Sequence, residues 1–528
     1  MSRLLHLGEI IAMNARHYPD KRGGRDLTRS MTFRQWNDRA CRLANALMGL
    51  GLEKGDRVAL LAYNCLEWLE IYAAVAKAGL VAVPVNFRLV GPEIRYIVEN
   101  AEAGAIIVQD DLLERAEEIR ADLPLGTDRY IHFGTQRAPA GYRAYEDLIA
   151  GAAATEPSRQ VGSADPFALL YTSGTTGKPK GAIRTNGSLV LHAYIEQIDF
   201  GFGRDDLGLL VMPMCHANSL FFLFAFAACG AGCCVYDRKS FEPEHLLRTL
   251  AGDRFTFTSL VPTHYITMLG LSDAIKRGAD VDSVTKLLIS SAPARRETKL
   301  ALMEYFRNSQ LYEAYGSTEM GWVTMLRPDE QLSKLGSIGR EMTGTGRIKL
   351  LDSTGTEVPN GEPGEIYART PYAFQGYWKL PEKTAEAFRG DYCTVGDIGR
   401  RDGDGYYHLV DRKSNMIISG GENVYPSEVE QVLGTNPRIK DVAVIGVPDP
   451  KWGEATHAVV ILHPGTDVSE KDIIDWCRDR IAGFKRPKSI SFIAEHEMPR
   501  TATGKILHRV LRDRYAERAL VKGQVEWP

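Results

Sequence analysis

Short apolar runs alternate with amphipathic stretches along the first half of the chain. Residues 36–50 and 65–79 have the periodicity of helices, and residues 57–63 and 81–85 are apolar runs typical of strands. Further strand-like runs follow at residues 105–108, 209–212, 233–236, 255–261 and 287–289. Strands that alternate with helices form βαβ units, so the pattern predicts largely parallel sheets, and the number of runs requires more than one.

The pattern changes from about residue 348 to short strands separated by polar turns, which predicts an antiparallel β unit. After Asp411 a last segment has its own rhythm, with helices expected at residues 427–433, 468–481 and 506–519 and strands at 442–446 and 458–462. We therefore expect an N-terminal domain of residues 1–411 and a C-terminal domain of residues 412–528. The fold class is α/β: two α/β sheet subdomains with a β-barrel-like unit, followed by a small α+β domain.

One apolar stretch could suggest a membrane span. Residues 217–236 carry no charge and are rich in phenylalanine. Gly230 and Gly232 interrupt the stretch, so we expect a helix followed by a short strand inside an α/β core. The helix could line a substrate pocket, and no transmembrane segment is expected.

Composition narrows the class of protein. The chain has 528 residues, 25% charged residues and a net charge of -3, which is ordinary for a multidomain enzyme and gives nucleic acid no reason to bind. Its eight cysteines form neither a zinc motif nor a disulfide framework. The N-terminus lacks a signal-peptide core and the C-terminus lacks a peroxisomal address, so we expect a cytoplasmic protein. A homodimer is left open.

Residues 171–181 combine glycines, hydroxyls and lysines directly after an apolar run. Glycines let the backbone N–H groups approach an anion, and the hydroxyl and ammonium groups add donors, so the loop predicts a bound polyphosphate. It is not a Walker A loop, because its glycines are too close together and Pro179 follows Lys178 where that motif has Ser or Thr. An ordinary surface turn is the alternative. The candidate phosphate-binding residues are Thr172, Ser173, Gly174, Thr175, Thr176, Gly177 and Lys178.

Three later segments supply the other groups that an ATP site needs. Residues 312–319 offer an aromatic face in Tyr315 and, in Thr318 and Glu319, oxygen ligands for magnesium. Asp397 could accept hydrogen bonds from both ribose hydroxyls. Lys505 lies in a Gly/Thr-rich loop, and its ammonium could draw two anions together. Each segment taken alone is also compatible with a turn or a solvated surface.

Taken in order, these motifs, with Arg412 and residues 419–423, resemble those of the adenylate-forming superfamily, most closely its AMP-forming acyl-CoA synthetases. The resemblance extends from about residue 32 to Lys505. It implies a large N-terminal domain, a small mobile C-terminal domain, and ATP, Mg²⁺ and coenzyme A as reactants. A carboxylate would attack the α-phosphate of ATP to give acyl-AMP and pyrophosphate, and the CoA thiol would then displace AMP.

The resemblance also implies roles for individual residues. The 173–181 loop would bind the β- and γ-phosphates, Thr318 the α-phosphate region and Glu319 the magnesium ion, while Tyr315 and Gly316 would lie at the adenine. Asp397 would bind the ribose with help from Arg412, and Lys505 would be the catalytic lysine.

For coenzyme A, the resemblance implies a passage at Gly420 and Gly421. It also implies contacts to the CoA nucleotide from Trp452, Phe484, Arg486 and Lys488, although residues 482–488 could be a simple basic turn. Ser414 falls where relatives have an Asp or Lys hinge, so we expect domain rotation about residues 413–414.

The acid itself is less clear from the sequence. His216 matches a position that borders the acyl pocket in relatives, and it could equally be a core histidine. Ala217 replaces the aspartate by which amino-acid-activating relatives bind an ammonium group. Ser291 and Ala292 belong to a segment that is bulkier here than in most relatives. We expect an apolar acid, either a medium- to long-chain fatty acid or an aromatic carboxylate.

Three rival functions remain at this point. An acyl-AMP ligase that loads a separate carrier protein would release AMP without coenzyme A. A luciferase-like oxygenase would emit light or take up oxygen when supplied with an acyl-AMP. A regulatory nucleotide-binding protein would release no pyrophosphate, although Glu319 and Lys505 together speak against it.

Overall fold

The computed structural model describes residues 5–172, 178–290, 294–419, 422–449, 452–478, 480–501 and 504–521. The chain divides into two compact units. Unit 1 consists of residues 1–348 and 368–393, and unit 2 of residues 349–367 and 394–528. The division groups the small antiparallel sheet with the C-terminal elements, and the predicted domain boundary at 411/412 lies inside unit 2. That boundary stays a prediction.

Unit 1 contains a seven-stranded sheet in which every neighbouring pair is parallel except the last. Its strands in spatial order are β7 (Arg143–Ala144), β6 (Tyr130–Phe133), β5 (Ala103–Gln109), β3 (Arg57–Leu61), β4 (Val81–Val85), β8 (Pro166–Thr172) and β9 (Lys180–Thr185). The strands predicted at 57–63, 81–85 and 105–108 are β3, β4 and β5. The largely parallel sheet expected from the alternation of elements is therefore confirmed.

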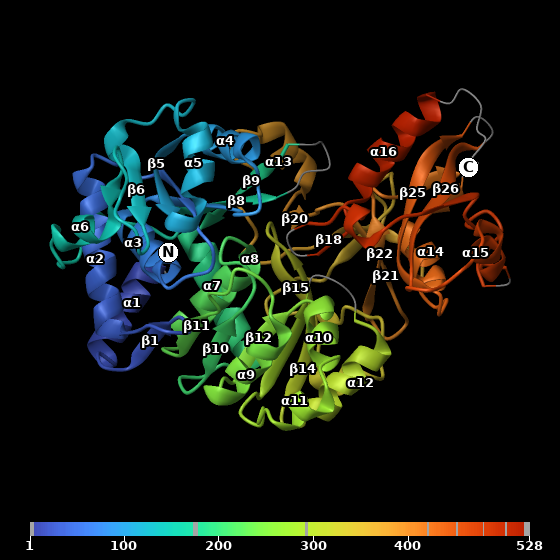
Figure 1. Ribbon diagram of the computed structural model, residues 1–528, viewed down its shortest axis with the longest axis horizontal. Helices are drawn as coiled ribbons and strands as arrows, with labels where there is room; N and C mark the ends of the chain where they lie inside the picture. The colour runs from blue at the N-terminus through green and yellow to red at the C-terminus, as the bar shows by residue number, and fades with distance from the viewer. Residues whose placement is uncertain are drawn as a thin grey trace. The chain divides into compact units, whose positions relative to one another are not determined.

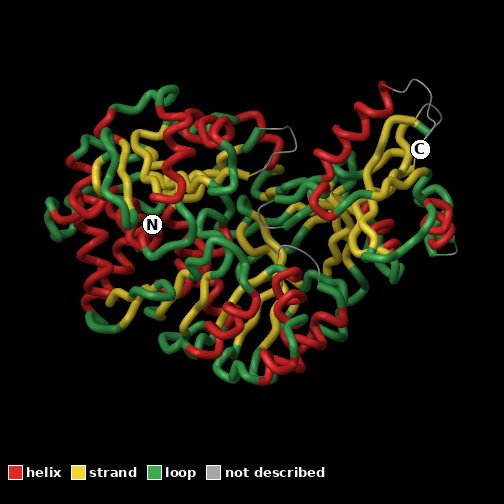
Figure 2. The backbone as a smooth tube through the Cα atoms, in the orientation of Figure 1, coloured by secondary structure: helices red, strands yellow, loops and turns green. Residues whose placement is uncertain are grey.

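A second sheet of unit 1 has nine strands, with a parallel centre and antiparallel edges. In spatial order these are β16 (Arg340–Glu341), β15 (Gly321–Leu326), β14 (Gln310–Ser317), β13 (Lys286–Ser290), β12 (Phe257–Leu260), β10 (Leu207–Leu210), β11 (Gly232–Val235), β1 (Arg22–Arg25) and β2 (Ser30–Thr32). Both sheets appear as yellow strands between red helices in Figure 2.

The helices of unit 1 cover these sheets in layers (Figure 1). They are α1 (Leu7–His17), α2 (Phe33–Gly49), α3 (Glu67–Ala78), α4 (Gly91–Asn100), α5 (Leu113–Arg120), α6 (Tyr145–Ala150), α7 (Asn186–Phe200), α8 (Ala217–Ala228), α9 (Pro243–Gly252), α10 (Pro262–Leu269), α11 (Asp273–Arg277), α12 (Arg296–Tyr305) and α13 (Pro381–Ala387). One apolar cluster joins the seven-stranded sheet, α3, α7, α8 and one face of the nine-stranded sheet. A second cluster lies on the opposite face, with α9, α10 and α12.

The apolar stretch at residues 217–236 folds as predicted. It forms α8 and then β11, and the two are separated at Gly230, whose φ of 68° lies in the left-handed region that favours glycine. Nearly every residue of α8 is buried, as expected for a helix that is apolar all round. Within the described part of the chain, no helix combines the length and apolarity needed to cross a membrane.

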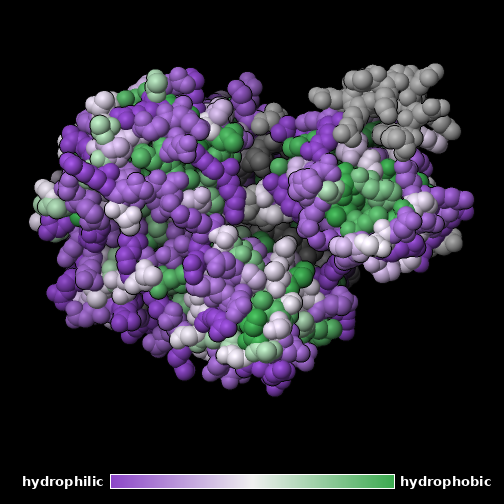
Figure 3. Space-filling model, viewed as in Figure 1, coloured by the Kyte–Doolittle hydropathy of each residue, from purple (hydrophilic) through white to green (hydrophobic). Residues whose placement is uncertain are grey.

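The face of the molecule drawn in Figure 3 is mostly hydrophilic, with some apolar surface over α10 and α12. The exposed apolar side chains of these two helices are Ile266, Leu300 and Met303. Isolated apolar residues of this kind are common on protein surfaces.

Unit 2 contains the antiparallel unit expected after residue 348. This sheet consists of β17 (Lys349–Leu351), β18 (Gly364–Tyr367), β21 (Asp397–Arg401) and β22 (Tyr407–Arg412). A short hairpin of unit 1, β19 (Phe388–Arg389) and β20 (Tyr392–Cys393), lies between β18 and β21 in the sequence.

The rest of unit 2 is a five-stranded sheet with three helices. Its elements are β23 (Ile417–Ser419), β24 (Glu422–Val424), α14 (Pro426–Leu433), β25 (Ile439–Asp449), β26 (Gly453–Leu462), α15 (Glu470–Trp476), β27 (Ser489–Phe492) and α16 (His508–Val521). The helix predicted at 468–481 is shorter than expected. The Ser469 side chain accepts a hydrogen bond from the Asp472 N–H and so caps the helix, which starts it at Glu470.

Candidate functional site

The predicted phosphate loop connects two antiparallel strands at one edge of the seven-stranded sheet. Thr172, the last residue of β8, lies opposite Lys180, the first residue of β9. Five of the predicted loop residues lie outside the described residues: Ser173, Gly174, Thr175, Thr176 and Gly177. The structure therefore fixes the two ends of the loop.

Two lysines of this segment lie over aromatic rings. The Lys178 Nζ is 5.3 Å from the centroid of the Tyr96 ring, and the Lys180 Nζ is 4.1 Å from that of Tyr377. Burial lowers the pKa of Lys180, and the nearby carboxylate of Glu319 opposes this shift. Cations over ring faces are held electrostatically, so positive charge is positioned at both lysines.

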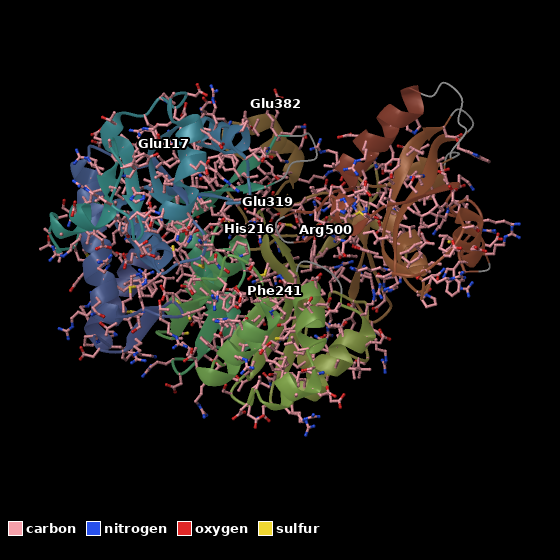
Figure 4. All side chains as sticks on the ribbon, in the orientation of Figure 1. Glu117, His216, Phe241, Glu319, Glu382 and Arg500 are labelled. Carbon is pink, nitrogen blue, oxygen red and sulfur yellow. The ribbon has the colours of Figure 1, made fainter. Side chains whose placement is uncertain are left out.

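Glu319 lies in the turn between β14 and β15 and is buried, with 6% of its surface exposed. Its Oε1 accepts hydrogen bonds from the hydroxyl of Thr172 at 3.3 Å and from that of Tyr377 at 2.9 Å. Burial, together with this carboxylate, raises the pKa of Tyr377. Two predicted site residues that are far apart in sequence, Thr172 and Glu319, are thus in direct contact. Figure 4 labels Glu319 and also His216, which precedes α8.

The β14–β15 pair is tightly packed where it carries Tyr315 and Gly316. Tyr315 is buried and lies opposite Thr324, and the register shifts between Tyr315 and Gly316. A Cβ on Gly316 would lie 2.2 Å from the Gly321 carbonyl oxygen and 2.8 Å from the Cα of Trp322. Any side chain at this position would push the two strands apart, so the approach requires glycine.

Arg184 is a site-supporting residue that sequence reasoning missed. It is fully buried on β9, donating from Nη1 to the Thr318 carbonyl at 2.7 Å and from Nη2 to the Tyr372 carbonyl at 3.0 Å. Burial lowers its pKa to about 10. The sequence signal that could have revealed it is a charged residue at an inward-facing position of the strand that follows the loop. It links the two segments that carry the predicted phosphate and magnesium groups.

The oxygen atoms near Glu319 suit a magnesium ion that is bound partly by phosphate and water, rather than a metal ion bound only by protein side chains. Among the residues that the structure describes, no group of three His, Cys, Asp or Glu side chains could hold a metal ion. Magnesium is commonly bound by one or two carboxylates, phosphate oxygens and water. The Glu319 carboxylate, beside the Thr172 hydroxyl and the loop, matches that pattern.

Unit 2 brings together three other predicted residues. Asp397 and Arg412 lie opposite each other on β21 and β22, with Asp397 Oδ1 3.1 Å from Arg412 Nε. Burial lowers the pKa of Lys505; Arg412 lowers it further, and Asp397 raises it. The residue as a whole retains solvent exposure, so these influences are partly screened. The ammonium, guanidinium and carboxylate nevertheless form one electrostatic group.

The segment that carries Lys505 is held by backbone and side-chain hydrogen bonds among residues 500, 501, 504 and 505. The Thr501 N–H donates to the Lys505 carbonyl at 2.7 Å, and the Lys505 N–H donates to the Thr501 hydroxyl at 3.1 Å. Arg500 donates to the Gly504 carbonyl at 2.9 Å and pairs with Asp441 of β25. These bonds define the position of the Lys505 backbone.

The predicted CoA contacts lie in two segments of unit 2. Trp452 and Phe484 are exposed aromatic residues, at 39% and 40%, and the Lys488 Nζ is 5.9 Å from the Trp452 ring centroid. Arg486, which lies between Phe484 and Lys488 in the sequence, is partly buried. The Lys488 ammonium also donates to the Gly483 carbonyl. Exposed aromatic rings beside cations suit a nucleotide base and its phosphates. Gly420 and Gly421 lie outside the described residues.

The predicted acyl-pocket residues lie at the start of α8 and after β13. His216 directly precedes the helix and Ala217 is its first residue, while Ser291 and Ala292 lie outside the described residues. Asn218, which sequence reasoning missed, donates from Nδ2 to the hydroxyls of Ser259 at 2.9 Å and Ser290 at 3.2 Å. It therefore links α8 to the ends of β12 and β13.

Comparisons with known proteins identify the family. The AMP-binding enzyme family matches residues 11–378, and the AMP-binding enzyme C-terminal domain matches residues 428–505. The chain is 36% identical to feruloyl-CoA synthase from Amycolatopsis sp, over 96% of this chain and 99% of the relative. It is 34% identical to the long-chain-fatty-acid–CoA ligase FadD13 from Mycobacterium tuberculosis, over 92% and 93%.

A solved structure shows the same similarity. The anthranilate CoA ligase AuaEII in complex with anthranoyl-AMP superposes with a TM-score of 0.87 at 29% identity, covering 98% of this chain and 99% of that one. The expected fold class and enzyme class are confirmed, and ATP, Mg²⁺ and coenzyme A are the reactants of such enzymes. The chain belongs to the AMP-binding enzyme family, as an AMP-forming acid–CoA ligase of the adenylate-forming superfamily.

Proposed function

We propose that this ligase activates an apolar carboxylic acid without a free α-amino group, either an aromatic acid or a medium- to long-chain fatty acid. The observation that carries the proposal is α8, a buried apolar helix that begins at Ala217 beside His216. Ala217 has no carboxylate to pair with the ammonium group of a substrate beside this helix. Burial of an unpaired ammonium is costly. The similar proteins are named for aromatic and for long-chain acids.

In the adenylation step, Lys505 would contact both the substrate carboxylate and the α-phosphate. Its three N–H donors and positive charge would bring two anions together and stabilise the charge that develops in the transition state. Asp397 favours the charged ammonium, whereas burial and Arg412 lower its pKa, so the charge of Lys505 depends on both neighbours.

The nucleotide contacts are proposed residue by residue. The 173–181 loop would bind the β- and γ-phosphates, and Thr318 the α-phosphate region. Glu319 would hold magnesium, which neutralises phosphate charge when bound. Tyr315 and Gly316 would lie at adenine, and Asp397 with Arg412 at the ribose. The contact of Glu319 with Thr172 supports placing the magnesium role at the start of the loop.

For the thioester step, the proposed contacts to the CoA nucleotide come from three exposed side chains and one partly buried one: Trp452, Phe484 and Lys488, and Arg486. Gly420 and Gly421 would line the pantetheine passage. We keep 411/412 as the proposed domain boundary and Ser414 as the proposed hinge. A cytoplasmic location is also proposed, since all eight cysteines are free thiols, as is usual in a reducing compartment.

A pyrophosphate-release assay across aromatic and aliphatic acids, with and without coenzyme A, tests this function. We expect acid-dependent pyrophosphate release and acyl-CoA formation with apolar acids, and none with free amino acids. Preference for a free amino acid, or pyrophosphate release that coenzyme A never converts to a thioester, would overturn the proposal.

A further inference from the structure

A buried polar cluster lies between α8 and the nine-stranded sheet. Asn218 in the first turn of α8 donates both hydrogens of its Nδ2, one to the Ser259 hydroxyl of β12 and one to the Ser290 hydroxyl of β13. Ser259 is 3% and Ser290 is 2% exposed, whereas Asn218 keeps partial solvent access. Three polar side chains from three elements thus meet in an otherwise apolar layer.

The cluster has hydrogen-bonding capacity that the fold does not use. Each serine oxygen accepts one bond from Asn218 and still has its own hydroxyl hydrogen to donate. Among the described residues, no acceptor receives these hydrogens and no donor reaches the Asn218 Oδ1. The two serine hydroxyls are buried, and buried polar groups nearly always have partners, so their spare donors indicate a ligand group; the Asn218 Oδ1 beside them is reachable from solvent.

The cluster lies at the edge of the sheet where a ligand is expected. Ser290 is the last residue of β13 and lies opposite Ala314, the residue before Tyr315 in β14. Asn218 follows His216 and Ala217 at the start of α8. Ligands of open α/β sheets bind at the carboxyl ends of parallel strands, and this end also carries Tyr315, Thr318 and Glu319.

Further along the same face of the sheet, aromatic rings are closely packed. Phe257 precedes Ser259 by two residues on β12, so both face α8. The Phe257 ring is fully buried, and its centroid is 4.6 Å from that of Phe222, 5.0 Å from that of Phe202 and 5.6 Å from that of Phe226. A long alkyl chain would have to displace this close-packed cluster, which is costly.

We propose that Asn218, Ser259 and Ser290 determine the specificity of the acyl site by binding a hydrogen-bonding substituent, such as a phenolic hydroxyl, at the far end of a compact acid. The inference rests on the proposed function and narrows it: a ring-sized acid is favoured over a long-chain fatty acid. A hydroxyl substituent would accept from a serine O–H and donate to the Asn218 Oδ1, which uses both spare capacities.

Matched substrate pairs give the first test. The kcat/KM for pyrophosphate release is measured with 4-hydroxycinnamic and cinnamic acid, with 4-hydroxybenzoic and benzoic acid, and with octanoic and palmitic acid. We expect the hydroxylated member of at least one pair to be used about tenfold or more better than its partner, because a site built to bond a hydroxyl rejects the analogue without it. Equal use of both members in each pair, or highest activity with palmitic acid, would overturn the inference.

Variants give the second test. Ser259→Ala and Asn218→Ala should move the ratio of kcat/KM between hydroxylated and unsubstituted acids toward one, mainly through loss of activity on the hydroxylated acid. Ser283→Ala, whose hydroxyl bonds the Phe255 carbonyl in a surface loop, is the matched control and should keep the wild-type ratio. Circular dichroism and melting curves establish whether each variant is folded. If Asn218→Ala does not fold, the smaller Ser259→Ala change still provides the test. Unchanged ratios in both cluster variants would contradict the inference.

The two proposals fail differently. If no carboxylic acid supports pyrophosphate release and thioester formation, the proposed function fails. If apolar acids are activated without preference for the hydroxylated members, the proposed function holds and only this inference fails.

Discussion

Asp397 and Arg412 face each other across the β21–β22 ladder, and the Arg412 Nε lies 3.1 Å from the Asp397 Oδ1. Asp397 is almost fully buried, whereas the Arg412 side chain is about half exposed. Both influence Lys505, in opposite directions. A substitution of Asp397 or Arg412 will therefore also change the electrostatic environment of Lys505.

Replacing the lysine is the most direct test of the chemistry. Lys505→Ala should reduce adenylation by roughly a hundredfold or more, because it removes the charge that stabilises the transition state. Thioester formation from supplied acyl-AMP should be largely spared. Pyrophosphate release and single-turnover thioester formation measure the two half-reactions separately.

Lys440→Ala, which removes an exposed lysine paired with Glu495, is the control and should leave both half-reactions unchanged. An equal loss in the two half-reactions of Lys505→Ala would contradict the assignment.

The pH dependence of adenylation tests the electrostatic group. In the role proposed for Lys505 its ammonium is the active form, so the rate should fall as pH rises through its lowered pKa. Asp397→Asn removes a charge that raises this pKa and should move the alkaline limb to lower pH. Arg412→Ala removes a charge that lowers it and should move the limb to higher pH.

The measurement is kcat for pyrophosphate release at saturating ATP between pH 6 and 10, since both variants are also expected to weaken ATP binding. Shifts of the two limbs in the same direction would show that neither residue acts through the charge of Lys505.

Much of the framework is predictable from the sequence, but the contacts that build the site are not. Apolar runs such as 81–85 become central strands because a strand buried on both faces needs no polar positions, and Gly230 ends α8 where left-handed backbone is required. The contact between Thr172 and Glu319 depends instead on two strand turns meeting across 147 residues of sequence. Arg184, Tyr377 and Asn218 were missed for the same reason: their partners are distant in the chain.

Because β14 and β15 lie very close together at Gly316, adding one methyl group there should destabilise the protein. Gly316→Ala places a Cβ against the Gly321 carbonyl and Trp322, so the strands must separate. We expect a loss of roughly 1–3 kcal/mol in the free energy of unfolding, and weaker adenylation because Tyr315 and Glu319 move with the strands. Thermal melting and pyrophosphate release measure the two effects.

Gly252→Ala at the end of α9 is the matched control, because a Cβ there meets nothing within 4 Å. It should be neutral or slightly stabilising, since alanine favours a helix. Similar melting temperatures for the two variants would argue against the tight approach at Gly316.

A buried acid on α7 predicts a pH-dependent stability. Glu196 is fully buried, its Oε1 accepts a hydrogen bond from the Trp322 indole N–H at 2.7 Å, and burial raises its pKa well above the usual value. The folded state therefore holds a proton that the unfolded state releases above a pKa of about 4.3. Stability from this group is complete below that pH and declines as pH rises toward the folded pKa.

Glu196→Gln keeps the acceptor for Trp322 and removes the titration. The melting temperature of the variant relative to wild type should rise with pH above about pH 5 and level off above the folded pKa, because the wild type loses up to about 1.4 kcal/mol per pH unit from this group between the two pKa values. Glu114→Gln on the surface of α5 should give a curve parallel to wild type. A constant or falling difference for Glu196→Gln would mean that this carboxyl is ionised in the folded protein, where Arg184 is the cation that acts on it.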